Sequence, residues 1–356
     1  MMTARAASRP TAPLTPLLLS ACIGLTMAAC ESVTVPLPTS PSPVISAVVS
    51  NIYLATFDSL DARAARLQSA LDALAASPSD ETLAAAQSAW RSARQPYENN
   101  EAFAFGPLVT EGFDPQMDTW PIDRAGIDAL LAGPAPITQA LVDGLDGSLK
   151  GFHGVEYLLF GLNGRTTPEA LGVRERDYLT SAGASLAAAA SRLHDAWAPT
   201  GGNFAGQLTT AGQSGSVYPS MGAALQDVVG GLVECTDEVA NSKLAGPLTT
   251  GSADYEESRF SDNTLADLEN DVGGVQLVYL GGVSSLIAAA DPATDQLVRQ
   301  QISAALAALA AVRPSFDAAL HHDPALLRSA QQAVLTLNQT LTNRIVPLVG
   351  GIADAD

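Results

Sequence analysis

The chain has 356 residues and carries 37 acidic against 18 basic side chains, a formal net charge of −19 at pH 7. A chain this acidic is repelled by nucleic-acid phosphates and by anionic lipid head groups, so the charge excludes binding partners of both kinds. The surplus of carboxylates favours a cation as partner, either a metal ion or a basic protein. We expect most of these charges simply to form a solvated surface.

The first 29 residues have the pattern of a secretion signal. Arg5 and Arg9 give a positive start, and an apolar run follows from Leu17 to Ala29. This run is too short to cross a membrane, and no later run reaches the roughly 18 uninterrupted apolar residues that a transmembrane helix needs. Removal of the signal takes away two arginines and no acidic residue, which leaves the mature chain still more acidic.

Cys30 ends this segment in Met27-Ala28-Ala29-Cys30, which resembles a bacterial lipobox, the motif whose cysteine receives lipid. Leu19-Ser20-Ala21-Cys22 is the alternative; it matches the consensus better but leaves a very short apolar run. We favour Cys30, because the Pro/Ser-rich stretch 30–43 follows it like a tether. The sequence therefore predicts a lipid-anchored protein of the bacterial cell envelope, facing the periplasm or exposed at the cell surface.

Only Cys235 then remains in the mature chain, so no disulfide is expected within one molecule. We expect Cys235 to be a small buried hydrophobic residue.

The mature chain is rich in alanine, and its apolar residues recur at three- and four-residue steps, which predicts an all-α protein. A clear example is the series Leu54, Phe57, Leu60, Ala64, Leu67, Leu71 and Leu74. We predict helices over residues 53–76, 81–105 (with a kink at Pro96), 122–131, 137–160, 169–197, 218–241, 264–287, 291–319 and 324–348.

These helices are expected to form two bundles. Residues 44–200 form the first, 217–350 form the second, and the Gly/Thr/Ser-rich stretch 201–216 links them. The similar sizes indicate a duplicated up-and-down bundle with a site at the junction, although no sequence repeat demonstrates the duplication. The long irregular connection 241–261 is of the kind that often carries function.

His153 and Glu156 are the most informative pair of residues. They lie three positions apart in an otherwise apolar helical segment, so they share one face of the helix. Buried polar groups need partners, which a metal ion or polar residues of other helices would supply.

Two other segments carry unusual combinations of polar residues. In 90–101, Arg91, Arg94, Glu98 and Glu101 follow helical spacing beside Trp90 and Tyr97. Solvent-facing ion pairs are the alternative there. In 255–267, Thr264 and Asp267 have the spacing of a capping box, which places Arg259 and Asp262 just before a helix N-terminus. Simple helix capping by Asp262 and Asn263 is the alternative.

Together these segments resemble the imelysin family. The resemblance rests on Gly151-x-His153-x-x-Glu156, on Trp90, Arg94, Tyr97, Glu98 and Glu101, on Ser258 to Thr264, on Trp120-Pro121-Ile122-Asp123 and on Tyr279-Leu280-Gly281. It extends in the expected order over about residues 44–349.

The resemblance implies two all-helical domains, a lipid-anchored or periplasmic location, a link to iron uptake and a classification among metallopeptidases. It implies a polar site between the bundles, with His153, Glu156, Glu98 and Glu101 as metal ligands. Arg94, Tyr97, Asp123, Arg259 and Asp262 would lie around them and hold the ligand. The implied cofactor is a divalent or ferric ion, with iron favoured and zinc as an alternative.

Two observations weigh against proteolysis. The sequence lacks His-Glu-x-x-His, and the inverted motif His-x-x-Glu-His would need histidine where Tyr157 stands. His194, His321 and His322 are not expected to reach the site.

Three hypotheses follow. The first is a lipoprotein that binds a metal ion or a small anionic metal complex and works with proteins of iron uptake. The second is a metallopeptidase in which Glu156 would be catalytic. The third is a structural lipoprotein whose polar network only holds the bundles together. Arg94 and Arg259 favour an anionic complex, because a cation near metal ligands repels a bare metal ion.

Overall fold

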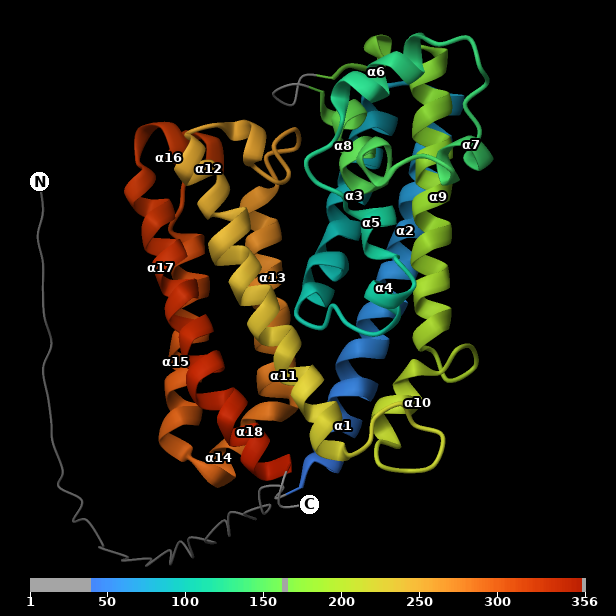
Figure 1. The fold of residues 1–356 in the computed structure, drawn as a ribbon. Coiled ribbons are helices and arrows are strands. Elements are labelled where there is room, and N and C mark those ends of the chain that lie inside the picture. The colour runs from blue at the N-terminus through green and yellow to red at the C-terminus, as the bar shows by residue number, and fades with distance from the viewer. Residues whose placement is uncertain (1–39, 162–165, 354–356) are drawn as a thin grey trace, which may run out of the picture. The chain divides into compact units, whose positions relative to one another are not determined.

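The computed structural model describes residues 40–161 and 166–353, and this part of the chain contains helices and loops but no strand. Two groups of helices lie next to each other (Figure 1). The predicted all-α class is therefore confirmed. The predicted signal peptide, Cys30 and most of the predicted tether lie outside the described residues.

In the first group, the long helix α2 packs against both α3 and α9. The helices of this group are α2 (Leu54–Ala76), α3 (Asp80–Glu101), α4 (Pro107–Thr110), α5 (Asp114–Met117), α6 (Arg124–Ala132), α7 (Gln139–Asp143), α8 (Gly151–Phe160) and α9 (Val173–Trp197). The apolar series predicted for α2 is its buried face, from Phe57 to Leu74. Ser79 begins α3 with a capping box to Thr82, and the helix continues through Pro96.

In the second group, α11 and α15 pack against α13 and α17. Its helices are α11 (Met221–Glu238), α12 (Ala245–Thr250), α13 (Thr264–Val278), α14 (Ser284–Ala290), α15 (Pro292–Ala310), α16 (Phe316–His322), α17 (Pro324–Thr340) and α18 (Val346–Ala353). Across both groups, the described residues include four π-helical segments that connect or extend helices: Val49–Tyr53, Val239–Lys243, Tyr279–Val283 and Leu341–Ile345.

The remaining two helices are α1 (Pro41–Val48), which begins at the end of the stretch predicted as a tether and continues into the predicted first bundle, and α10 (Phe204–Thr209), which lies in the predicted linker. Helix α1 begins before residue 43 and packs against α11 and α14 of the second group. Helix α10 lies inside the stretch 201–216, and the ring of Phe204 packs 4.9 Å from that of Trp197. Both stretches are therefore packed parts of the fold as far as they are described.

Three other predicted boundaries were wrong. The helix expected over 137–160 is divided into α7, a 3-10 turn and α8, because Gly151 adopts a positive φ of 72° that a helix cannot continue through. The helix expected over 291–319 ends at Ala310, since Pro314 cannot donate to a helical hydrogen bond. The connection 241–261, expected to be irregular, contains α12.

Small residues let the second group approach α3 closely. A Cβ on Gly274 of α13 would lie 2.2 Å from the carbonyl oxygen of Asn99, and one on Gly231 of α11 would lie 2.6 Å from that of Ala102. Backbone therefore meets backbone at this junction. The close approach also brings Arg94 of α3 within 3.4 Å of Asp267 of α13.

Two continuous helical runs, Pro41–Ala76 and Thr264–Ala290, are long and apolar enough by length and composition to cross a membrane. Both belong to the packed helices described above, with Phe57 and Val275 buried in the core. Core helices commonly meet this criterion, so it does not by itself indicate a membrane span.

Candidate metal centre

Where the two groups meet, charged side chains are buried in unusual number. Five carboxylates pair with two cations, Arg94 and Lys243, and a sixth carboxylate pairs with His153. The carboxylates are Glu98 of α3, Asp118 after α5, Glu156 of α8, Glu257 before α13, and Asp267 and Asp271 of α13. Arg94 and the carboxylates of Glu98, Glu156, Asp267 and Asp271 have no exposed surface. The cluster therefore carries a surplus of negative groups with little access to water.

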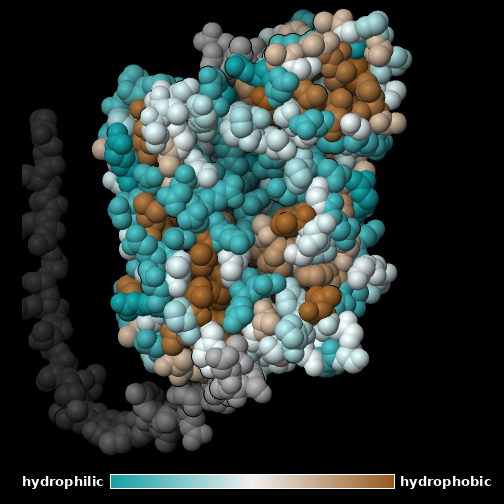
Figure 2. All heavy atoms as spheres, viewed as in Figure 1, coloured by the Kyte–Doolittle hydropathy of each residue, from teal (hydrophilic) through white to brown (hydrophobic). Residues whose placement is uncertain are grey.

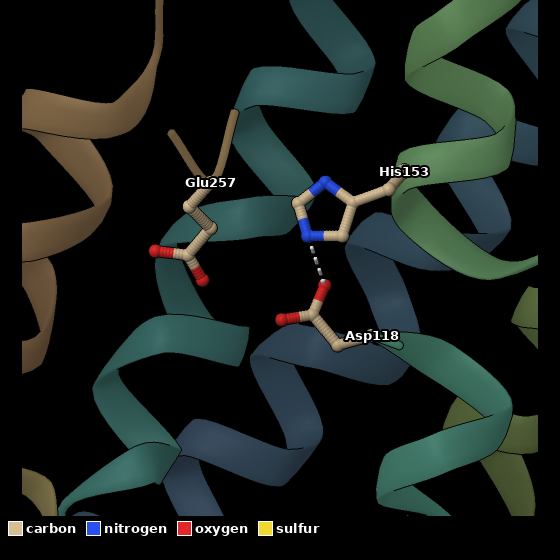
Figure 3. A group of neighbouring side chains, drawn as sticks. All are labelled: Asp118, His153 and Glu257. Atoms are coloured by element: carbon tan, nitrogen blue, oxygen red, sulfur yellow. Dashed lines mark ion pairs between the residues drawn. The ribbon is translucent and has the colours of Figure 1, made fainter. Parts of the chain in front are cut away.

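Asp118, His153 and Glu257 come from three separate segments and converge on one point (Figure 3). They offer one ligand atom each, and these atoms all lie within 4.8 Å of one another. His153 Nε2 is 3.3 Å from Asp118 Oδ1. Among the described residues, neither His153 Nε2 nor Glu257 Oε2 has a hydrogen-bond partner. One imidazole and two carboxylates are a donor set that suits iron, manganese or zinc.

Glu156 orients the imidazole of His153 through a contact with its Nδ1 atom. Its Oε2 lies 3.0 Å from His153 Nδ1, and its Oε1 accepts hydrogen bonds from the Ser261 amide at 2.9 Å and hydroxyl at 2.7 Å. A carboxylate in this position accepts a hydrogen bond from Nδ1–H, and Nε2 then faces Asp118. Metal-binding histidines are typically oriented by such a carboxylate. Glu156 thus positions the ligand histidine and is not one of the converging groups.

Arg94 lies among the acidic residues and is paired with four of them. It contacts Glu98 and Asp118 closely and reaches Glu257 and Asp267 at 3.4 Å. Its guanidinium packs 5.2 Å from the ring of Phe152. Because Arg94 is shared among several carboxylates, it does not neutralise the converging group.

Burial and pairing act in opposite directions on the acidic groups. Burial raises the pKa of Asp118 and of Asp267 to about 7, although Arg94 opposes the shift in both. For Glu98 burial also raises the pKa, but Arg94 and Lys243 outweigh it and lower the pKa to about 2. Burial lowers the pKa of His153, yet Asp118 and Glu156 outweigh it, so the net shift is upward. Without a bound cation, the cluster therefore retains protons near neutral pH, and a metal ion would displace them.

A cavity of about 450 Å³ opens onto this cluster. Its polar wall includes Glu101, Asp114, Asp118, Glu238, Lys243 and Glu257, and Trp120 and Tyr255 line it as well. Figure 2 shows hydrophilic residues in the hollow between the two groups of helices. The ring of Trp120 lies 4.8 Å from that of His153 and so covers one side of the imidazole.

Most of the predicted site residues meet here. Arg94, Glu98, His153 and Glu156 lie in the cluster, and Glu101 lines the cavity. Tyr97 is buried behind the cavity wall, where its hydroxyl donates to Asp114 at 2.6 Å.

Three predicted residues lie elsewhere. Asp123 is exposed and caps α6 by accepting from the Gly126 amide at 2.9 Å. Arg259 pairs with Asp254, and Asp262 is exposed with a φ of 56°. Arg259 and Asp262 line a different cavity of about 320 Å³, together with Arg91.

The other histidines lie outside the cluster. His194 pairs with Asp58 at 2.9 Å, His321 pairs with Asp317 at 3.3 Å, and His322 is exposed.

Sequence reasoning missed five residues of the cluster: Asp118, Lys243, Glu257, Asp267 and Asp271. Asp267 was expected in a capping box with Thr264, and this was wrong. Asn263 is the N-cap residue, and Thr264 accepts from the Ser258 amide at 3.0 Å. The four-residue spacing of Asp267 and Asp271, which places both on one face of α13, was the available signal.

Comparison with known proteins identifies the family to which the chain belongs. The family model described as imelysin matches residues 53–344. Iron-regulated protein A of Synechococcus elongatus is 35% identical over 318 residues, which cover 86% of each chain.

Two solved structures share the fold. A Parabacteroides distasonis protein described as an iron-regulated protein A precursor superposes with a TM-score of 0.80 at 23% identity, over 90% of this chain and 97% of that one. An imelysin-like protein of Psychrobacter arcticum gives a TM-score of 0.72 at 14% identity, over 89% and 98%. By the extent of the family match and the identity to the Synechococcus protein, the chain belongs to the imelysin family.

Proposed function

We propose that the protein binds a metal ion at Asp118, His153 and Glu257 and takes part in iron acquisition from a lipid anchor on Cys30, facing the periplasm. One observation carries the proposal: Asp118, His153 and Glu257 converge, Glu257 Oε2 is buried without a hydrogen-bond partner in the described chain, and His153 Nε2 has there the 3.3 Å ion contact with Asp118 but no hydrogen bond. Unpaired buried polar atoms are costly unless a ligand completes them.

The charge of the cavity favours a hydrated cation over an anionic metal complex. Five acidic residues line it, namely Glu101, Asp114, Asp118, Glu238 and Glu257, and among the described residues of the wall Lys243 is the one cation. An anionic chelate would be repelled by this wall, whereas a cation is concentrated there. Arg259, which was expected to hold such a complex, lines the other cavity.

Iron is the favoured metal because of the relatives. Both the Synechococcus protein and the Parabacteroides structure carry the name iron-regulated protein A, which describes their regulation by iron. A protein made in response to iron supply, with a buried histidine–carboxylate group, is suited to capture of that metal. Manganese and zinc are compatible with the same donors.

No specific observation favours the peptidase hypothesis. Both oxygens of Glu156 are engaged by His153 and Ser261, so this carboxylate is not available to activate a water molecule. The cavity volume suits an ion with its water shell or a small ligand.

Metal content tests the proposal directly. Metal-free protein is titrated with Fe²⁺ under anaerobic conditions, with Mn²⁺ and with Zn²⁺, and bound metal is measured by calorimetry and elemental mass spectrometry. We expect one ion per wild-type chain, no binding by His153→Ala, and unchanged binding by His194→Ala, which removes a histidine from the surface pair with Asp58.

Two results would overturn the proposal. Wild-type protein that binds none of the three metals would do so, and so would a His153→Ala variant that binds like wild type. If the variant instead melts at lower temperature in metal-free buffer and the wild type binds no metal, the polar cluster has a structural role.

A further inference from the structure

A second group of carboxylates in the same cluster already holds a cation of the protein itself. Lys243 Nζ lies 3.1 Å from Glu98 Oε2, 3.0 Å from Glu257 Oε1 and 3.1 Å from Asp271 Oδ2. One oxygen of each of these three residues lies within 4.8 Å of the others. An ammonium group has three donors, and here each donor faces a different carboxylate.

The charges in this group do not balance. Three carboxylates surround one ammonium, and Arg94, the second cationic partner of Glu98 and Glu257, is shared with two further carboxylates outside this group. Within the described chain, Asp271 Oδ1 and Glu257 Oε2 have no hydrogen-bond partner, although Asp271 is fully buried and Glu257 is 5% exposed. The ammonium therefore leaves acceptor oxygens unsatisfied that a doubly charged ion with its water ligands would satisfy.

Lys243 lies on a different segment of the chain from the three carboxylates, so it can be replaced without changing the segments that carry them. It is the last residue of the π-helical segment Val239–Lys243, whereas the three carboxylates come from α3, the loop before α13, and α13. Its side chain is 10% exposed and lines the cavity. Glu98 and Asp271 lie on the helices α3 and α13, so we expect these two carboxylates to keep their places when the lysine charge is removed.

We propose that Glu98, Glu257 and Asp271 form a second cation site in which the ammonium of Lys243 takes the place of a divalent ion. Lys243 thereby limits the protein to one bound metal ion. This goes beyond the proposed function, because a different set of side chains holds the second cation and only Glu257 is common to both groups.

The ligand class follows from the donors. The second site offers carboxylate oxygens and no histidine, so it suits a hard divalent ion such as Mn²⁺, Mg²⁺ or Ca²⁺. The first site, with its imidazole, accepts softer ions as well. Mn²⁺ binds to both donor sets and is therefore the probe of choice.

The experiment counts bound Mn²⁺ in Lys243→Met, which removes the charge and keeps an unbranched side chain. Free Mn²⁺ is measured by electron paramagnetic resonance during titration. We expect two ions per chain in Lys243→Met and one in wild type and in Lys243→Arg, which keeps the cation. The double variant Glu98→Gln/Lys243→Met should lose the added ion. A folded Lys243→Met that binds no more Mn²⁺ than wild type would overturn the inference.

Removal of the first site separates this inference from the proposed function. His153→Ala/Lys243→Met should bind one Mn²⁺, at the three carboxylates. If wild type binds no metal and Lys243→Met binds one ion, the second site stands and the proposed function fails. If both proteins bind one ion, the proposed metal site stands and the second site fails. If Lys243→Met folds only when Mn²⁺ is added, the result supports the second site. If it stays unfolded with Mn²⁺ as well, the carboxylates do not accept the ion and the inference is wrong.

Discussion

The Nδ1 atom of His153 and Oε2 of Glu156 lie 3.0 Å apart, and this contact leaves Nε2 of the imidazole directed at Asp118. Glu156 is itself fixed by two hydrogen bonds from Ser261, a residue 105 positions later in the chain. The motif of α8 therefore depends on the loop before α13 for its orientation. This loop also supplies Glu257 to the same site.

The variant Glu156→Gln should weaken metal binding without abolishing it. The imidazole keeps its place, but it loses the carboxylate that fixes its orientation, a change that typically costs about 10- to 100-fold in metal affinity. Calorimetric titration with Mn²⁺ measures the change. Glu269→Gln, which alters a glutamate in a long 3.8 Å ion pair with Arg313, is the control and should bind like wild type. Equal affinity in the two variants would contradict the role given to Glu156.

The metal-free protein should become less stable as pH rises from 5 to 8. The pKa values of Asp118 and Asp267 are raised from 3.8 to about 7, so the folded protein keeps protons that the unfolded chain releases above pH 4. Where the native state binds more protons than the unfolded state, the free energy of unfolding decreases with pH. The raised pKa of His153 acts in the same direction. The lowered pKa of Glu98, about 2, affects stability only in acid below this window.

Thermal melts in metal-free buffer measure this dependence. Mn²⁺ should raise the melting temperature more at pH 8 than at pH 6, because fewer protons then compete for the ligands. Asp118→Asn should flatten the metal-free profile. A melting temperature that rises between pH 5 and 8 without metal would show that these carboxyl groups are already ionised in the native state.

Gly151→Ala should both destabilise the fold and impair the site. Gly151 has a φ of 72°, and a Cβ there would lie 2.4 Å from the carbonyl oxygen of Met117, the residue before Asp118. Gly251→Ala is a matched control: its φ is 65°, but nothing lies within 4 Å of the added atom. The positive φ alone costs roughly 1–2 kcal/mol.

We expect chemical denaturation to show a loss of about this size for Gly251→Ala and a larger one for Gly151→Ala. Only Gly151→Ala should lose metal affinity. Similar losses of stability in the two variants would mean that the contact with Met117 relaxes freely.

The adjacent glycines of α11 should respond differently to alanine. A Cβ on Gly231 would lie 2.6 Å from the backbone oxygen of Ala102, whereas nothing lies within 4 Å of one on Gly230. Gly230→Ala should stabilise the helix by about 0.5–1 kcal/mol, since alanine is the better helix former. Gly231→Ala should lower the stability by forcing α11 away from the first group of helices. Urea unfolding of both variants provides the comparison, and equal effects would argue against close backbone packing at this junction.

Cys30→Ser should release the protein from the membrane. If Cys30 carries the lipid, the variant appears in the soluble periplasmic fraction or as an uncleaved precursor, while Cys22→Ser remains anchored. Cell fractionation with mass spectrometry of the N-terminus distinguishes the two. The reverse result would identify Cys22 as the lipidated residue, and an unmodified wild type would remove the lipoprotein proposal altogether.

Much of the fold could be predicted because helix formation depends on near neighbours. The Phe57 to Leu74 series, the cap at Ser79 and the shared face of His153 and Glu156 all follow from spacings of three or four residues. Two helix boundaries were missed at Gly151 and Pro314, whereas the error at Asp267 arose from a long-range contact. Asp267 has the spacing of a capping residue, but Arg94 of α3 lies 3.4 Å from its carboxylate and draws it into the cluster.

The sequence by itself determined that the protein is all-helical, that the chain is strongly acidic, and that a histidine and a glutamate share a buried helical face. Only the tertiary structure decided which groups complete the site. Asp118, Lys243 and Glu257 come from segments far apart in the chain, and nothing in their local sequence distinguishes them from surface charges. Burial gives these residues their chemistry, because a carboxylate removed from water must be protonated, paired with a lysine or arginine, or bound to a metal ion.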